Sequence, residues 1–317
     1  MCTAVYKNGG RKLFGRSLDV EVSYGESVII TPRARELSFS ENDALMRHCA
    51  MIGIGCAEEG YPLYFDAVNE YGVAMAGLNL TDSAVYHPSM NDKYNVASYE
   101  LIPWVLSQCR NADDVIALLE KTNVTKRSFS ENIRATPLHW MICCGERCFA
   151  VESLAEGLKI YEDPFGVLTN EPPFPYQMKN LVGYMGLTPK QPPNKLCDAD
   201  IKPYTLGVGS MGLPGDHSSC SRFVRALFTK ENTLLGEEES EAVNGFFHIM
   251  DTVKVPFGCV EGREGKPHFT RYVSCADTES LVYYFVTYRC RRIRSIALKE
   301  SLLELPFIIT YPLDDIE

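Results

Sequence analysis

The sequence predicts an α+β fold in which two antiparallel sheets lie between helical layers. This prediction rests on the order of secondary-structure patterns along the chain, which is β-rich runs, helical patterns, β-rich runs, two amphipathic helices and β-rich runs again. Two tight turns, at Asn8-Gly9-Gly10 and at residues 69–72, each join β-rich runs and indicate hairpins. No stretch has the composition of a linker and no segment repeats, so we expect residues 1–317 to form one domain.

The first part of the chain is predicted to be strand and then helix. Its β-rich runs are Thr3–Lys7, Lys12–Leu18, Ser27–Arg33, Met51–Cys56, Leu63–Val68 and Val73–Leu80. Apolar residues then recur at helical spacing in Val96–Cys109, where Pro103 has to lie in the first turn. Asn111 is a predicted N-cap for a second helix, whose buried stripe begins at Val115.

The second part is predicted to return to strand, continue through two helices and end in strand. The earlier strands are Leu138–Cys143, Cys148–Ser153, Leu158–Tyr161 and Val167–Thr169. Residues 172–203 hold seven prolines and are expected to form a loop around a short helix, Gln177–Met185. Two amphipathic helices and three strands follow, at Cys220–Lys230, Glu239–Val253, Phe269–Cys275, Leu281–Tyr288 and Ile293–Leu298.

Composition and charge narrow the classes of function. The formal net charge of −10 argues against a nucleic-acid or anionic-membrane role. Residues 1–20 hold no apolar signal region and no run reaches the roughly 18 apolar residues of a membrane span, so we expect a cytoplasmic protein without membrane insertion. Twelve cysteines scattered along such a chain predict reduced, mostly buried thiols.

The most informative residue is Cys2, which follows Met1 directly. Cysteine is small enough for methionine excision, so we expect Met1 to be removed. A thiol and a free α-amino group would then share one residue, and an α-amine with a pKa of about 7.7–8 can accept a proton near neutral pH. Cys2 is therefore a candidate nucleophile that carries its own base; a Met-Cys start without chemical meaning is the alternative.

Polar residues at the ends of predicted elements are candidates for the rest of a site. The first hairpin returns Arg16 and Asp19 towards the start of the chain, where they could favour a thiolate and orient an amine. Asn79 and Asn170 each follow an apolar run and could donate to an oxyanion, and Arg222 begins a helix. The alternatives are a surface ion pair, two turn formers and a helix-surface charge.

Two sequence motifs resemble binding sites but lack the context that such sites need. Residues 207–212 match G-x-G-x-x-G, but the turn sequence Leu213-Pro214-Gly215-Asp216 follows where a dinucleotide site needs a helix. We interpret these glycines as a loop that approaches another segment closely. Cys143, Cys144 and Cys148 have no second cysteine pair, so a structural zinc site is not expected.

A series of ordered motifs is similar to those of the choloylglycine hydrolase family, which comprises bile salt hydrolases and penicillin V acylases. The resemblance runs from residue 2 to the C-terminal strands and implies the N-terminal nucleophile fold, an αββα sandwich. The motifs are Met1-Cys2-Thr3, Phe14-Gly15-Arg16-Ser17-Leu18-Asp19, Asn69-Glu70-x-Gly72, Ala76-Gly77-Leu78-Asn79, Leu138-His139-Trp140, Leu168-Thr169-Asn170-x-Pro172 and Leu213-Pro214-Gly215-Asp216-x3-Cys220-Ser221-Arg222-Phe223.

The resemblance implies the catalytic set Cys2, Arg16, Asp19, Asn79, Asn170 and Arg222. Cys2 would be the nucleophile and its α-amino group the base, with Arg16 favouring the thiolate and Asp19 orienting the amine. Asn170 and the backbone amide of Asn79 would form the oxyanion hole, and Arg222 would stabilise the charge network of the site. The resemblance implies no metal or organic cofactor. It also implies that the protein assembles as a homotetramer.

The resemblance also implies the substrate. The position matching Asn79 is usually Asn in bile salt hydrolases and often Tyr in penicillin V acylases, so we expect hydrolysis of the amide bond of glycine- or taurine-conjugated bile acids. The alternatives are a penicillin V acylase or another N-acyl amide hydrolase of the family, and an inactive binding protein with the same fold. Residues expected to line the substrate pocket are Leu18, Tyr24, Ala57, Phe129, Ile133 and Leu138.

Overall fold

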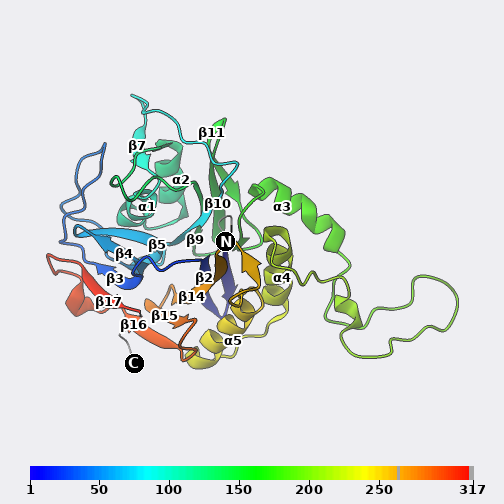
Figure 1. Ribbon diagram of the computed structural model, residues 1–317. Helices are drawn as coiled ribbons and strands as arrows, with labels where there is room; N and C mark the ends of the chain where they lie inside the picture. Colours follow the sequence, from blue (N-terminus) through cyan, green and yellow to red (C-terminus); the bar gives the residue numbers. More distant parts are fainter. Residues whose placement is uncertain (263–264, 314–317) are drawn as a thin grey trace.

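The computed structural model describes residues 1–262 and 265–313, and two antiparallel sheets form its centre (Figure 1). The first sheet has the strand order β12-β1-β2-β14-β15-β16, and β13 pairs with β14. In chain order its strands are β1 (Cys2–Gly9), β2 (Arg11–Val20), β12 (Val167–Leu168), β13 (Val260–Glu261), β14 (Pro267–Asp277), β15 (Val282–Thr287) and β16 (Arg294–Ala297). The predicted hairpin is formed, because Gly10 adopts a positive φ of 73° between β1 and β2.

The second sheet has the strand order β11-β10-β9-β6-β5-β4-β3-β17. In chain order its strands are β3 (Ser27–Thr31), β4 (Met51–Glu58), β5 (Tyr61–Asn69), β6 (Ala74–Asn79), β9 (Leu138–Cys144), β10 (Arg147–Leu154), β11 (Gly157–Glu162) and β17 (Ile309–Pro312). A separate parallel pair, which the sequence did not predict, joins β7 (Tyr94–Ala97) to β8 (Thr122–Thr125).

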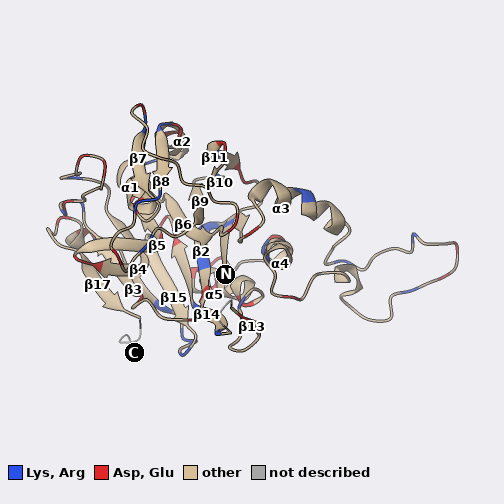
Figure 2. Ribbon diagram, turned by 45° about the horizontal axis from the view of Figure 1, so that its top comes forward, with Lys and Arg blue, Asp and Glu red and all other residues tan. Residues whose placement is uncertain are grey.

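Helices cover the outer face of each sheet, which confirms the predicted αββα sandwich. The helices α1 (Leu101–Gln108) and α2 (Ala112–Glu120) contact the second sheet, α1 through β5 and β6 and α2 through β11. On the other side α4 (Ser219–Asn232) contacts β1, and α5 (Glu239–Asp251) contacts β2 and β14. Figure 2 shows most charged residues on loops and helices around strands that are largely uncharged.

Strand β6 shows how the core is divided. Ala74, Ala76 and Leu78 belong to the apolar cluster between the sheets, whereas Met75 belongs to the cluster beneath α1 and α2. Successive side chains of a strand point to opposite faces, so β6 is buried on both. This explains why its sequence is an almost continuous apolar run rather than an alternating one.

Two predicted helices differ from the observed ones at their ends. The first begins at Leu101 rather than at residue 96, because β7 pairs with β8 and the Glu100 carboxylate accepts a hydrogen bond from the nitrogen of Ala97. The short helix α3 (Phe174–Asn180) begins earlier than predicted and continues as the 3₁₀ turn η1 (Leu181–Tyr184). Its first nitrogen donates to the buried carboxylate of Glu152 over 2.9 Å. Two further 3₁₀ turns are η2 (Val208–Ser210) and η3 (Glu300–Leu302).

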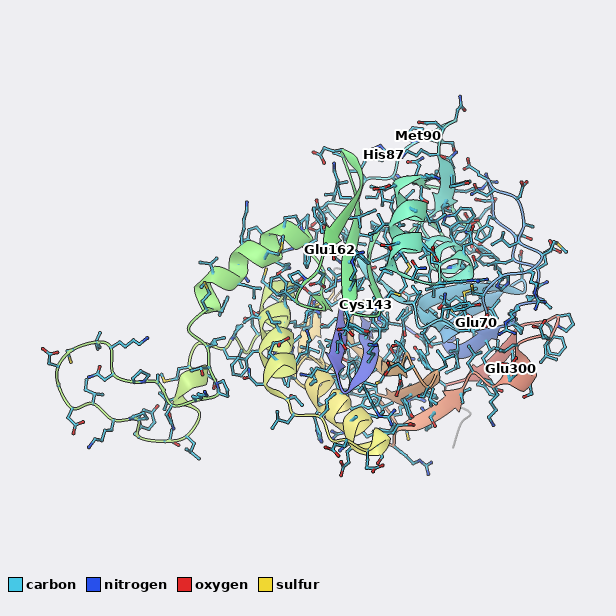
Figure 3. The ribbon with its side chains drawn as sticks, turned by 180° about the vertical axis from the view of Figure 1, so that it is seen from behind. Glu70, His87, Met90, Cys143, Glu162 and Glu300 are labelled. Carbon is cyan, nitrogen blue, oxygen red and sulfur yellow. A yellow bond between two sulfur atoms is a disulfide. The ribbon has the colours of Figure 1, made fainter. Side chains whose placement is uncertain are left out.

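The expectation that all thiols are reduced is wrong for one pair. Cys143 and Cys148 form a disulfide inside the second sheet, in the region where Figure 3 labels Cys143. The reason is the register of β9 and β10, which places the two residues directly opposite each other with 4.2 Å between their Cα atoms. The other ten cysteines, Cys2 included, are free.

Residues 189–208, which we call the arm, project from the body of the molecule (Figures 1 and 3). The base of the arm is closed by a hydrogen bond of 3.0 Å from the nitrogen of Thr188 to the oxygen of Gly209. A Cβ atom at Gly209 would lie 2.0 Å from the carbonyl oxygen of Lys190, so only glycine fits there. The interpretation that the glycines of 207–212 serve a close backbone approach is thereby confirmed for Gly209. It is wrong for Gly207 and Gly212, where a Cβ atom would meet no atom within 4 Å and the backbone instead has positive φ values of 81° and 91°.

Candidate active site

Cys2 is the first residue of β1, which lies inside the first sheet between β12 and β2. Its side chain is 2% exposed, and strand register places it opposite Leu18 of β2. In an antiparallel pair, directly opposite residues project from the same face of the sheet. Cys2 therefore lies in a buried position at the start of an inner strand, where β2 pairs with it on one side and β12 pairs with the nearby Ala4 and Val5 on the other.

Asn170 follows β12 and makes hydrogen bonds to three other candidate residues. Its Oδ1 accepts from the Cys2 nitrogen over 2.8 Å and from Nη2 of Arg222 over 2.8 Å. Its Nδ2 donates to the carbonyl oxygen of Asn79, also over 2.8 Å. Its own backbone nitrogen donates to Oγ of Ser219, at the start of α4, so both ends of the residue are held.

Arg222 lies in the first turn of α4 and is fully buried, which excludes the helix-surface interpretation. Ser218 caps this helix by accepting from the nitrogen of Ser221. The Arg222 guanidinium donates to the carbonyl oxygen of Cys2 and, over 2.6 Å, to Oγ1 of Thr3. Burial lowers the pKa of Arg222, while the nearby Asp19 carboxyl and Cys2 thiol oppose that shift.

Arg16 is also buried, at 1% exposure, and is held at the second sheet. Its Nη1 donates to the carbonyl oxygens of Gly77, over 2.9 Å, and Phe65, over 3.3 Å. Within the described part of the chain its Nη2 is buried without a hydrogen-bond partner. Burial by itself would lower the pKa of Arg16, but the nearby Cys2 thiol and Asp66 carboxyl raise it. A permanent positive charge therefore lies beside the thiol.

The Asp19 carboxylate is placed beside the site but does not contact the Cys2 nitrogen. Its Oδ1 accepts from Oγ1 of Thr270 over 2.7 Å, and its Oδ2 accepts from Oγ of Ser17 over 3.3 Å. Its backbone instead pairs with Met1: the Met1 amine donates to the Asp19 oxygen over 2.7 Å, and the Asp19 nitrogen donates to the Met1 oxygen over 2.9 Å. With Met1 in place, the Cys2 nitrogen is an amide and cannot serve as a base.

One charged residue near the site was missed by sequence reasoning. Asp66 of β5 is buried between the sheets and accepts from the hydroxyl groups of Tyr272, over 2.7 Å, Ser274, over 2.9 Å, and Tyr283. Burial raises the pKa of Asp66, and the nearby Arg16 guanidinium opposes that rise. Asp66 stands inside an apolar-looking run, Leu63–Val68, so no local signal distinguished it.

The predicted pocket residues come from the strand that pairs with β1 and from surrounding loops. Leu18 is buried opposite Cys2, and Leu138 pairs with Asn79 where β6 meets β9. Ile133 holds the loop between β8 and β9 by accepting a hydrogen bond of 3.0 Å from the nitrogen of Phe129. Strand register thus places Leu18 beside Cys2 and Leu138 beside Asn79, whereas Ile133 lies in the loop that precedes β9.

The loops of the predicted pocket meet at the β4–β5 hairpin. The carbonyl oxygen of Tyr24 accepts from the Cys56 thiol over 3.0 Å, and its half-exposed ring packs edge-on against Phe65 with 5.9 Å between centroids. Phe129 packs against Tyr61 with 5.9 Å between ring centroids. The exposed Ala57, near the end of β4, lies in the same hairpin. Aromatic and apolar side chains from three segments of the chain thus gather at this hairpin.

Over residues 1–262 and 265–313, no cluster of three or more His, Cys, Asp or Glu side chains is placed to hold a metal ion. Over the same residues, no helix combines the length and the apolar character needed to cross a bilayer. The chemistry that the arrangement offers is that of a buried thiol beside two guanidinium groups, with amide groups from Asn170 and Asn79 at its end.

Known proteins with similar sequences cover almost the whole chain. A bile salt hydrolase/transferase from Lactiplantibacillus plantarum is 44% identical over 314 residues, which are 99% of this chain and 97% of that protein. A conjugated bile acid hydrolase from Lactobacillus gasseri is 34% identical over 316 residues, which are 98% of this chain and the full length of that protein.

Solved structures agree with these sequence comparisons. A mutant of the conjugated bile acid hydrolase from Clostridium perfringens superposes with a TM-score of 0.90 at 33% identity, covering 98% of this chain and 96% of that one. The penicillin V acylase from Agrobacterium tumefaciens superposes with a TM-score of 0.79 at 20% identity, covering 100% of this chain and 94% of that one, and shares the fold. The family model for linear amide C–N hydrolases of the choloylglycine hydrolase family matches residues 2–311. With a buried Cys2 at the start of an inner strand of the αββα sandwich, this chain is an amide hydrolase that belongs to the choloylglycine hydrolase family.

Proposed function

We propose that the enzyme hydrolyses the amide bond of glycine- or taurine-conjugated bile acids and releases the free bile acid and the amino acid. The observation that carries the proposal is the buried network that joins Cys2 to Asn170 and Arg222, in a chain 44% identical to a bile salt hydrolase/transferase. The apolar and aromatic pocket rim supports a large nonpolar acyl group, since burial of apolar area contributes roughly 25 cal/mol per Å².

In the proposed first step, removal of Met1 leaves the Cys2 nitrogen as a free amine, which takes the thiol proton. The thiolate adds to the amide carbonyl carbon, and the carbonyl oxygen becomes an oxyanion. Arg16 favours the thiolate through its charge, and Asp19, which is buried beside β1, orients the α-ammonium group once Met1 has left. Asn170 Nδ2 and the Asn79 backbone amide stabilise the oxyanion.

In the proposed second step, the tetrahedral adduct collapses. The C–N bond breaks, the α-ammonium group gives its proton to the leaving nitrogen, and a thioester to Cys2 remains. Water, deprotonated by the same α-amine, then adds to the thioester carbonyl, and the C–S bond breaks to release the carboxylic acid. Arg222 holds Asn170 and the Cys2 carbonyl in position through both steps.

Side-by-side turnover of two substrates tests the choice of acyl group. We expect glycocholate to be hydrolysed with a higher kcat/KM than penicillin V. Faster cleavage of penicillin V would contradict the proposal and identify a penicillin V acylase. Comparable and very slow rates on both would point to another N-acyl amide substrate.

A nucleophile variant tests whether the protein is an inactive binding protein. We expect Cys2→Ser to lose most of the hydrolytic activity, because a hydroxyl group is a weaker nucleophile than a thiolate. Cys197→Ser, on an exposed cysteine of the arm, is the matched control and should hydrolyse as well as the parent. Equal rates from Cys2→Ser and the parent would exclude Cys2 as the nucleophile.

We also propose that the enzyme is a homotetramer assembled through the arm. The arm exposes large apolar side chains that monomers rarely leave in water, at Leu196 (87%), Tyr204 (85%) and Leu206 (87%). Static light scattering tests the assembly. We expect a tetramer for the parent and smaller species for the triple variant in which these three residues become serine; a parent monomer would contradict the proposal.

A further inference from the structure

A second hollow lies beside the candidate active site. A cavity of about 700 Å³ is bounded by the ends of β14 and β15 and by residues 23–27. Tyr272 lies in its wall, opposite Leu18, which is in turn opposite Cys2. Adjacent strands are about 4.8 Å apart, so this wall lies about 10 Å from Cys2 along the sheet. Cys2 is not among the residues that line the cavity.

One side of the cavity is aromatic. Phe269 packs edge-on against Phe257, with 5.2 Å between ring centroids, and against Tyr288, with 4.9 Å. Phe257 and Tyr288 are 59% and 48% exposed, so their rings face the cavity rather than the core. Exposed aromatic faces grouped around a cavity of this size suit a flat, rigid apolar body.

The other side is cationic. Arg271 lies over the Phe269 ring, and its Nε has no hydrogen-bond partner within residues 1–262 and 265–313. Among the described carboxylates that line the cavity there is only Glu26, which lies 3.9 Å from that nitrogen and also accepts hydrogen bonds from Oγ of Ser23 and from the nitrogen of Tyr24. The exposed Arg289 also lines the cavity. Two arginines and one carboxylate are thus the charged residues among the described residues of the cavity wall.

A neighbouring cavity of about 470 Å³ extends the same surface. It shares Tyr272, Thr287 and Tyr288 with the first, and Arg291 lies in its wall. Its Lys254 is paired with Asp251 over 2.6 Å. In a chain with a formal net charge of −10, this concentration of arginine is a local feature rather than a consequence of composition.

Hydrogen bonds between segments hold these walls in place. The nitrogen of Tyr288 donates to the Arg271 carbonyl over 2.9 Å, and the nitrogen of Phe257 donates to the Tyr288 hydroxyl over 3.1 Å. The nitrogen of Leu313 donates to the Glu26 carbonyl over 3.3 Å. A cavity whose walls are already ordered costs little conformational entropy when a ligand enters.

We propose that this cavity is a second binding site, for a small amphipathic anion. Its rigid apolar body would lie against Phe257, Phe269 and Tyr288. Its carboxylate or sulfonate would accept hydrogen bonds from Arg271 and Arg289. The site does not depend on the reaction proposed for Cys2, and it borders the segment that carries Tyr24.

Two dyes with the same ring system test the site on the full-length enzyme. 1-Anilinonaphthalene-8-sulfonate carries a sulfonate, and N-phenyl-1-naphthylamine is its neutral counterpart. We expect Arg271→Met and Arg289→Met each to weaken binding of the sulfonate dye about tenfold or more, since a charge-assisted hydrogen bond contributes about 1.5–3 kcal/mol and 1.4 kcal/mol is tenfold. Neither variant should change binding of the neutral dye.

Two controls keep the test decisive. Arg292→Met removes a nearby exposed arginine that lines neither cavity and should leave both dyes bound as in the parent. Arg289 has no ion pair within the described ranges, so its variant reports on the site even if the Arg271 variant folds poorly. Unchanged sulfonate binding in Arg289→Met, or an equal loss in Arg292→Met, would overturn the proposal. So would dye binding that disappears as the enzyme self-associates, because the face would then be an interface.

Discussion

Asn170 accepts a hydrogen bond of 2.8 Å from the nitrogen of Cys2, although 168 positions separate the two residues. The contact exists because β12, the short strand before Asn170, pairs with β1 through Ala4 and Val5. The nitrogen that the proposed reaction needs as a base is thus already positioned by a neutral side chain while Met1 is present.

The first prediction concerns the free terminus. Insertion of Gly-Ser between Met1 and Cys2 moves the terminal amine away from the thiol, so we expect hydrolysis to fall by at least about 100-fold, the usual contribution of a positioned base. Intact mass should show that the active parent lacks Met1. Iodoacetamide should still alkylate Cys2 in the extended protein; full activity with the extension present would refute the shared thiol and base.

The second prediction concerns the buried charge beside the thiol. Arg16→Met removes the guanidinium that favours the thiolate, so we expect alkylation of Cys2 by iodoacetamide at pH 7 to slow by about tenfold or more, because each 1.4 kcal/mol is tenfold. The rate should recover at higher pH. Arg11→Met, on the same strand but with a partly exposed side chain that pairs with Asp277 rather than lying beside Cys2, is the control and should alkylate normally.

The third prediction separates the two ends of the Asn170 amide. Asn170→Asp keeps an acceptor for the Cys2 nitrogen and for Arg222 but loses the Nδ2 donor. If that donor stabilises the oxyanion, kcat should fall about 100- to 1000-fold with little change in KM. A change confined to KM would instead assign Asn170 to substrate binding.

The fourth prediction is a pH dependence of stability that arises at Asp163, in the loop before β12. Burial raises the pKa of this carboxyl to about 6, against the hydrogen bonds from the nitrogens of Phe165 and Val167 that lower it. Because the pKa is higher in the folded state than in the unfolded one, the folded state binds more protons between about pH 4 and 6. Its free energy of unfolding should therefore fall as pH rises through that window, by up to about 3 kcal/mol.

Asp163→Asn removes this titration. Urea unfolding between pH 4 and 6.5 should show the free energy of unfolding of the variant rising relative to that of the parent as pH increases. A constant difference between the two proteins across the window would contradict a raised pKa.

Structural features that depend on a few neighbouring residues could be predicted from the sequence. The Asn8-Gly9-Gly10 turn predicted the β1–β2 hairpin that brings Arg16 and Asp19 back to Cys2. Asn111 predicted a cap, and its side chain accepts from the nitrogens of Asp113 and Asp114. In each case the signal and the structure lie within a few residues of each other.

Features that depend on distant pairing were not predictable. Thr270, which donates to Asp19, is set by the register of β14 with β2, and that register includes a bulge. The hydrogen bond from the Tyr272 hydroxyl to Asp66 forms only because the two sheets stack. The Cys143–Cys148 disulfide follows from the register of β9 and β10. The chemical roles assigned to the catalytic residues and the pocket residues stay predictions, as do the single-domain boundary and the cytoplasmic location.

The residues proposed for bond cleavage and those proposed for recognition belong to parts of the fold with different tolerance to change. Cys2 and Arg16 are buried on inner strands, where close packing leaves little room for another side chain, whereas Tyr24, Ala57 and Phe129 stand on loops or strand ends. Loops accept new side chains and new lengths at little thermodynamic cost. Descendants of this scaffold can therefore diversify the compounds they accept while inheriting an unaltered reaction centre.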